Sequence, residues 1–78
     1  MIDLADARAL VAAALELSPE EVPADADVES LAAWDSLGHV KVVLAVEARL
    51  GRPLASAELA QFRSLADAAR LLADTQAA

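Results

Sequence analysis

The 78-residue chain contains no cysteine and no tyrosine, and it has only one tryptophan and one phenylalanine. Without cysteine it can form no disulfide, and it has no thiolate to act as a nucleophile or metal ligand. Six basic side chains stand against 13 acidic ones, which gives a net charge of −7. The chain therefore lacks the positive charge that binds nucleic acid or anionic membranes, and long-range attraction favours positively charged protein partners.

The shortness of the chain sets a second limit. A domain of this size buries one thin core, so we expect a single domain over residues 1–78. We do not expect a deep substrate pocket of the usual several hundred Å³ beside that core. The sequence has no signal peptide and no apolar run long enough to span a membrane. A cytoplasmic, monomeric protein is the expectation.

Helix-forming residues dominate what remains. Apolar residues make up 58% of the chain, and most are alanine or leucine, which have the highest helix propensities. The pattern predicts an all-α fold, a small four-helix bundle with three longer helices and one short helix. A long loop, pinned to the core by Val28 and Leu31, joins the first two helices. The expected helices cover residues 3–17, 36–50, 56–62 and 64–76.

Start and stop signals define the first helix and the turn after it. Asp3 is the expected N-cap of that helix. Its end is expected near Leu17, because Ser18 precedes Pro19 and a residue before proline disfavours helical geometry. The segment "SPEEVP" then predicts a single helical turn, with Ser18 as cap and Glu21 in the position of a capping-box glutamate.

Similar signals bound the later helices. Gly51, followed by Pro53, is a stop signal for the second helix. Ser56 is the expected cap of the short third helix. Ser64 and Asp67 have capping-box spacing at the start of the fourth.

The second helix carries two apolar stripes, although a surface helix of a small bundle needs only one. One stripe consists of His39, Val42, Val43, Val46 and Leu50. The other consists of Leu37, Val40, Lys41, Leu44, Glu47 and Ala48. Both stripes could be buried between neighbouring helices. Alternatively, the second is an exposed docking strip for a partner protein.

Ser36 stands at the start of this second helix, directly after Asp35. Either residue could simply cap the helix through its side-chain oxygen. The same position also suits an anion, because free backbone N–H groups and the helix dipole stabilise negative charge by about 0.3–1 kcal/mol. A phosphate ester on Ser36 is therefore physically favourable, and the residue pattern by itself goes no further.

A family resemblance extends this interpretation. The segment "DSLGHVKVVLAVEARLG" resembles the phosphopantetheine-attachment segment of acyl carrier proteins, in which Asp-Ser-Leu opens the second helix. "LSPEEVPADADVESL" and "FRSLADAARLL" are similar to the loop and the last helix entry of that family. The resemblance implies that a phosphopantetheinyl transferase attaches 4′-phosphopantetheine from coenzyme A to Ser36. The thiol of that arm would carry an acyl or amino-acyl group as a thioester, and the chain itself would not be an enzyme.

The resemblance also implies roles for the residues around Ser36. Asp35 would help to present Ser36 to the transferase. The remaining expected contacts, with the transferase and with acyl-loading or acyl-using enzymes, are Leu37, Val40, Lys41, Leu44 and Glu47. An adenylating enzyme, an acyltransferase or a ketosynthase would be such a partner.

Departures from the fatty-acid carriers of this family indicate a specialised pathway. Those carriers are strongly acidic along the second helix, whereas here Lys41 and Arg49 interrupt and only Glu47 is acidic. "WDSLGH" is more similar to discrete carriers of polyketide or related pathways. A carrier of primary fatty-acid synthesis and an unmodified helical adaptor are the alternatives.

Three further features have simpler interpretations. "DSLGH" places His39 near Ser36 and Asp35, but a hydrolase also needs an oxyanion hole, and the "GxSxG" turn is missing. We expect His39 to be a half-buried residue on the core-side face of the helix. "DADVES" begins like a calcium loop but lacks the required glycine, so we expect no metal site. Trp34 is expected to anchor the long loop on the bundle, or else to contact the arm, its cargo or a partner.

Overall fold

The computed structural model describes the backbone of residues 4–77 and the side chains of residues 4–73. Within that range it contains α1 (Leu4–Leu15), α2 (Ser36–Leu50), α3 (Ser56–Gln61) and α4 (Leu65–Ala77). A 3₁₀ turn, η1 (Pro19–Glu21), follows α1. The all-α prediction, with three longer helices and one short one, is confirmed.

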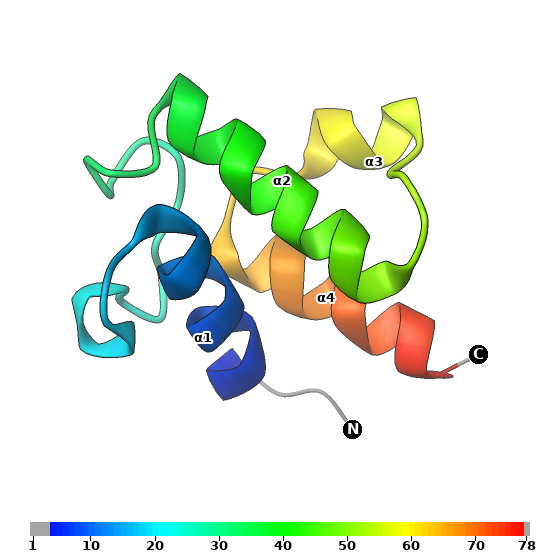
Figure 1. Cartoon of the computed structure of the whole chain (residues 1–78), viewed down its shortest axis with the longest axis horizontal. Coiled ribbons are helices and arrows are strands. Elements are labelled where there is room, and N and C mark those ends of the chain that lie inside the picture. The colour runs from blue at the N-terminus through cyan, green and yellow to red at the C-terminus, as the bar shows by residue number, and fades with distance from the viewer. Residues whose placement is uncertain (1–3, 78) are drawn as a thin grey trace.

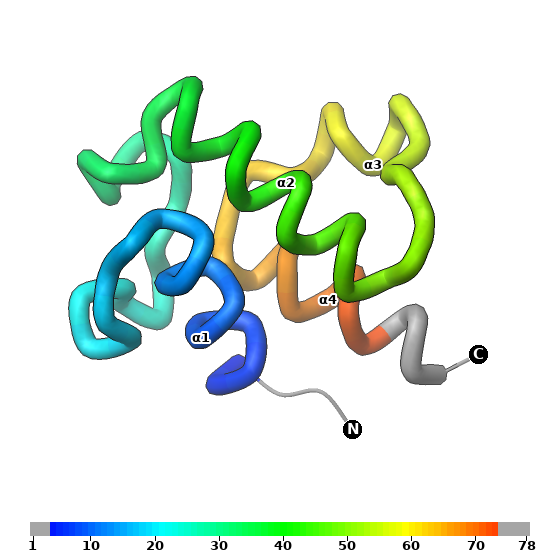
Figure 2. The backbone as a smooth tube through the Cα atoms, in the orientation of Figure 1, coloured from blue at the N-terminus to red at the C-terminus, as the bar shows by residue number. Residues whose placement is uncertain are grey.

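The three longer helices enclose the core. α1 contacts both α2 and α4, and α2 also contacts α4. The short α3 lies in the connection between α2 and α4, away from α1 (Figures 1 and 2). Among the described residues, every helix is too short or too polar to cross a lipid bilayer.

α1 ends two residues earlier than the sequence predicted. Glu16 adopts a left-handed conformation with φ of 61°, and the Leu17 N–H donates to the Ala12 carbonyl at 2.8 Å. These are features of a Schellman motif, which ends the helix before the chain reaches Pro19. Asp3, the expected N-cap of this helix, lies outside the described residues.

The core is made of small and branched apolar side chains around two aromatic ones. The largest fully buried side chains are Trp34, Phe62, Leu65, Leu72, Val11, Val22, Val42 and Val46. The long loop is fixed mainly by Ala26 and Trp34, which are buried, whereas the expected anchors Val28 and Leu31 are only half-buried. The Ala26 carbonyl also accepts from the Leu65 N–H at 3.0 Å, which ties the loop to α4.

Most of the other boundaries match the sequence prediction. α2 begins after the N-cap Asp35 and ends at Gly51, whose φ of 75° is the left-handed geometry that favours glycine. η1 has the predicted contact, with the Ser18 N–H donating to Glu21 Oε2 at 2.8 Å. At the start of α4, the Asp67 N–H donates to the Ser64 hydroxyl at 3.1 Å.

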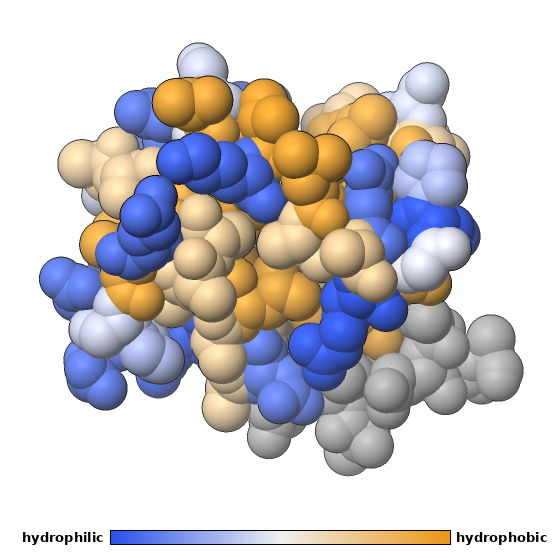
Figure 3. Space-filling model, in the orientation of Figure 1, coloured by the Kyte–Doolittle hydropathy of each residue, from blue (hydrophilic) through white to orange (hydrophobic). Residues whose placement is uncertain are grey.

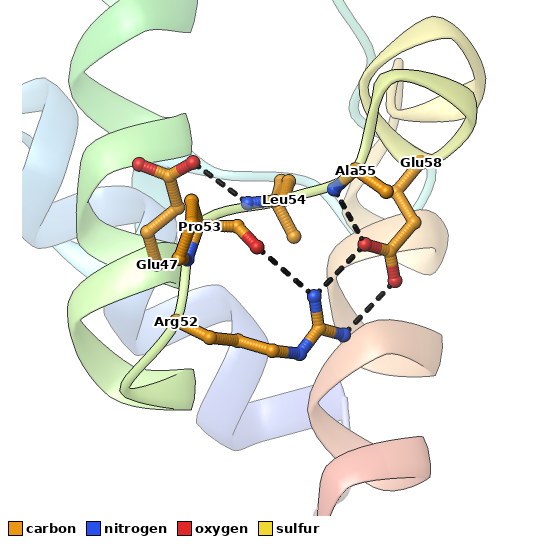
Figure 4. Close-up of polar contacts among 6 residues, drawn as sticks. All are labelled: Glu47, Arg52, Pro53, Leu54, Ala55 and Glu58. Atoms are coloured by element: carbon orange, nitrogen blue, oxygen red, sulfur yellow. Dashed lines mark hydrogen bonds and ion pairs between the residues drawn. The ribbon is translucent and has the colours of Figure 1, made fainter.

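The predicted cap of α3 is wrong by one residue. Ala55, not Ser56, is the N-cap, and its N–H donates to Glu58 Oε1 at 2.8 Å. Arg52 binds both carboxylate oxygens of Glu58, at 2.9 and 3.0 Å (Figure 4). The ion pair holds the Glu58 carboxylate where it accepts the N-cap N–H of Ala55, which is the glutamate half of a capping box.

Candidate functional site

The candidate site is built on the first turn of α2. Asp35 is the N-cap, and its Oδ1 accepts from the Gly38 N–H at 2.8 Å. Ser36 is the first helical residue and is exposed to solvent. Its hydroxyl makes no hydrogen bond within the part of the chain that is described. Because Asp35 provides the cap, the Ser36 hydroxyl is not needed to stabilise the helix and is accessible for chemistry.

Gly38 lets this first turn pack closely on the loop before it. A Cβ atom at this position would lie 2.3 Å from the Ala33 carbonyl oxygen and 2.9 Å from Leu15 Cδ2. Gly38 is buried, so there is no solvent space into which such a side chain could move. The glycine therefore fixes how closely the Ser36 end of α2 approaches the long loop and α1.

Three rings pack together next to Ser36. Trp34 is fully buried, and its Nε1–H donates to His39 Nδ1 at 3.0 Å. The edge of Phe62 meets both rings, with centroid distances of 6.3 Å to Trp34 and 5.4 Å to His39. The expectations that Trp34 anchors the loop and that His39 is half-buried on the core side are confirmed.

The local environment favours neutral His39. Burial lowers the pKa of its imidazole, and the positive charge of Arg63 lowers that pKa further. Nδ1 accepts the hydrogen bond from Trp34. The neutral ring therefore carries its proton on Nε2. Trp34 thus selects the tautomer as well as the orientation of the ring.

A recess of about 490 Å³ opens beside Ser36. It lies between the long loop, the start of α2 and the C-terminal end of α3. Its lining residues are Val28, Trp34, Asp35, Ser36, His39, Leu59, Ala60, Phe62 and Arg63. The sequence predicted no deep substrate pocket, and it did not indicate this recess, which is open at the surface. Side chains more than 20 positions apart form it, so no local sequence pattern indicated that Phe62 and Arg63 lie near Ser36.

The docking strip predicted on α2 is exposed. Leu37, Val40 and Leu44 have 66%, 53% and 58% of their surfaces accessible, while Val42 and Val46 on the opposite face are fully buried. Hydrophobic side chains stand out along α2 in the space-filling view (Figure 3). Of the two interpretations left open, burial of both stripes is therefore wrong.

The two charged members of the strip have partners within the chain. Lys41 Nζ lies 3.5 Å from Glu16 Oε2, in an exposed and therefore weak ion pair. Glu47 Oε2 accepts from the Leu54 N–H at 2.8 Å (Figure 4). Glu47 thus stabilises the turn between α2 and α3, and its carboxylate is partly turned away from the apolar strip.

The acidic loop segment organises its own backbone. Asp27 Oδ1 accepts from the N–H groups of Ser30 and Glu29, at 2.7 and 2.9 Å. These hydrogen bonds, that from Ser30 first, hold the pKa of the Asp27 carboxyl below its ordinary value. Within the described residues, no group of three potential metal ligands comes together.

Fold and site together define a class of protein, a small helical module that presents a serine at the start of its second helix beside an apolar strip. The family model for the phosphopantetheine attachment site matches residues 5–72. The chain belongs to this family, and its cofactor is the covalently attached 4′-phosphopantetheine that defines the family. Its function is that of an acyl or peptidyl carrier.

The comparisons with curated proteins and with solved structures gave no match. The family assignment therefore depends on the family model. Members of the family interact with phosphopantetheinyl transferases and with the enzymes that load or use the carried group.

Proposed function

We propose that Ser36 is the residue to which 4′-phosphopantetheine is attached. The observation that carries this proposal is the exposed Ser36 hydroxyl, which has no hydrogen-bond partner among the described residues and opens α2 directly after its cap. The helix dipole and the nearby backbone N–H groups stabilise the negative charge of a phosphodiester at this position. The surroundings of Ser36 therefore fit the group.

The attachment is a phosphoryl transfer from coenzyme A. The Ser36 oxygen forms a bond to the phosphorus atom that bears pantetheine, and the bond from that phosphorus to the bridging pyrophosphate oxygen breaks. Adenosine 3′,5′-bisphosphate leaves with the electron pair, and the serine proton passes to a base of the transferase. Once bound, the arm supplies the thiol that this cysteine-free chain lacks, and the thiol carries acyl groups as thioesters.

The strip of Leu37, Val40 and Leu44 is the proposed docking surface for the transferase and for the loading and using enzymes. Its exposed apolar side chains begin immediately after Ser36. Asp35 and Lys41 flank the strip and would provide polar contacts at its edge, and Glu47 lies at its far end. A partner bound here would have the arm within reach throughout the contact.

A polyketide or related specialised pathway is the proposed context. The exposed face of α2 has little negative charge, because Lys41 is basic and Glu47 is the one acidic residue of this helix. A partner that recognises a strongly acidic helix, as in primary fatty-acid synthesis, would find few carboxylates here. We also propose that residues 1–78 act as one monomeric carrier domain without catalytic activity of its own.

The test is intact-mass spectrometry after incubation with coenzyme A, magnesium and a promiscuous phosphopantetheinyl transferase. The wild-type chain should gain the mass of one phosphopantetheine, and Ser36→Ala should gain none. Ser56→Ala is the matched control, since Ser56 is likewise the exposed first residue of a helix. A chain that is never modified, yet loses partner binding in Leu44→Asp, would instead be a helical adaptor.

A further inference from the structure

The recess beside Ser36 includes a basic residue. The protein carries a net charge of −7, yet Arg63 lines the recess. Lys41, Arg52 and Arg70 are held in ion pairs with carboxylates. Arg63 makes no such pair within the described residues. A cation without a carboxylate partner is thus placed in the cavity that also contains Ser36.

His39 adds a second donor to the same recess. Its Nδ1 is occupied by Trp34, so the neutral ring presents an N–H at Nε2. This N–H donates no hydrogen bond to any other residue in the described part of the chain. Arg63 and His39 both line this recess. Each therefore offers N–H donors to a group bound in it.

The two acidic residues nearby accept backbone hydrogen bonds. Asp35 also lines the recess, but its Oδ1 accepts from the Gly38 N–H. Asp27, which Arg63 influences only weakly, accepts from Ser30 and Glu29. Neither carboxylate forms an ion pair with Arg63. The apolar side of the recess consists of Val28, Leu59, Ala60 and Phe62.

From these observations we propose that the recess is an oxyanion site for the loaded arm, a function that rests on the proposed attachment at Ser36. Arg63 and the Nε2–H of His39 bind negatively charged oxygens there, and the apolar side covers the adjoining carbon chain. Two sources have this chemistry: the phosphodiester on Ser36 and a carboxylate at the end of a short dicarboxylic acyl group. Charge-assisted hydrogen bonds of this kind are the strong ones in proteins.

The experiment compares four forms of the full chain by NMR of the arginine Nε–H and histidine side-chain signals. The forms are the unmodified protein, the phosphopantetheine form, the malonyl form and the butyryl form, prepared with the corresponding coenzyme A derivatives. Malonyl and butyryl groups have similar size, but only malonyl carries a carboxylate. Arg49, exposed at the other end of α2, is the internal reference.

The site is supported if the chemical shifts of the Arg63 and His39 side chains change and those of Arg49 do not. Movement on attachment of the arm alone identifies the phosphodiester as the ligand, and movement only in the malonyl form identifies the cargo carboxylate. Signals that stay unchanged in all three modified forms overturn the oxyanion site. A chain that gains no mass with coenzyme A contradicts the attachment itself, so the two failures are distinguishable.

A thermal measurement gives an independent check. The oxyanion contact should raise the melting temperature of the relevant modified form by roughly 4 °C above that of the unmodified chain. Arg63→Gln should abolish this rise, and Arg49→Gln, with the same change of charge, should retain it. An equal rise in both variants would overturn the role of Arg63.

Discussion

The two ends of α2 differ in how their polar groups are used. At the C-terminal end, Glu47 and Glu58 accept backbone N–H groups, and Arg52 binds Glu58 through two hydrogen bonds (Figure 4). At the N-terminal end, the hydroxyl of Ser36 and the guanidinium of Arg63 have no such partners among the described residues. One end stabilises a turn between helices, whereas the other leaves polar groups available to something outside the chain.

The largest predicted effect on stability concerns the two glycines, which lie near opposite ends of α2. Gly38→Ala should lower the free energy of unfolding by about 3 kcal/mol, because the new Cβ would overlap the Ala33 carbonyl. Gly51→Ala should lower the free energy of unfolding by only about 1 kcal/mol. The positive φ at this position strains an alanine, but its Cβ would contact no other atom. Urea unfolding followed by circular dichroism measures both. Equal costs would show that Gly38 is not a point of close packing.

The next prediction separates the two faces of α2. Val42→Ala should lower the free energy of unfolding by about 2 kcal/mol, because Val42 is fully buried. Leu37→Ala should change it by less than about 0.5 kcal/mol, since Leu37 is mostly exposed. Leu37→Ala should nevertheless slow modification by the transferase. The contrary result, loss of stability and modification together in Leu37→Ala, would place this side chain in the core.

Acid should weaken the C-terminal end of α2 below pH 4.5. The hydrogen bonds from Arg52, and then that from the Ala55 N–H, lower the pKa of Glu58 from 4.5 to about 2. The ionised carboxylate therefore stabilises the fold fully above pH 4.5, and that contribution is lost as the pH falls toward 2. Glu58→Gln should show a smaller fall in melting temperature across this window. Parallel profiles for the two proteins would mean that the ion pair has no net effect.

The smallest predicted effect is at the recess. Burial, and then Arg63, lower the pKa of His39 below 6.5, so the unfolded chain takes up this proton first. Stability should therefore fall as the pH drops below 6.5, and the loss should stop below the folded-state pKa. His39→Gln should remove this component from the melting profile. A wild-type protein that becomes more stable through the same window would contradict the lowered pKa of His39.

The sequence was informative where the signals are local. The predicted start of α2 at Ser36 and its stop at Gly51 are correct, because a cap and a left-handed stop act within one turn. The sequence left open whether Asp35 or Ser36 is the cap. The end of α1 was missed because Glu16, a non-glycine residue, adopts the left-handed conformation. The cap of α3 was missed because Arg52 positions Glu58, a contact between side chains six residues apart.

Helical spacing predicted the second apolar stripe of α2 but left its exposure open, and it gave no sign of the recess. The recess depends on Phe62 and Arg63 reaching the start of α2, which only the packing of the long loop and α3 can bring about. The tight packing at Gly38 is equally non-local, since it involves the Ala33 carbonyl and Leu15. Assignment of Ser36 came from its position on the helix together with the family resemblance.

The most direct test is fragmentation mass spectrometry of wild-type protein purified after incubation with coenzyme A and the transferase. Peptides that span the start of α2 should carry the phosphopantetheine, with the fragment series placing it on residue 36. An arm found on any other hydroxyl, for instance that of Ser30 or Ser56, would contradict the attachment site and remove the functional meaning given to the surfaces around it.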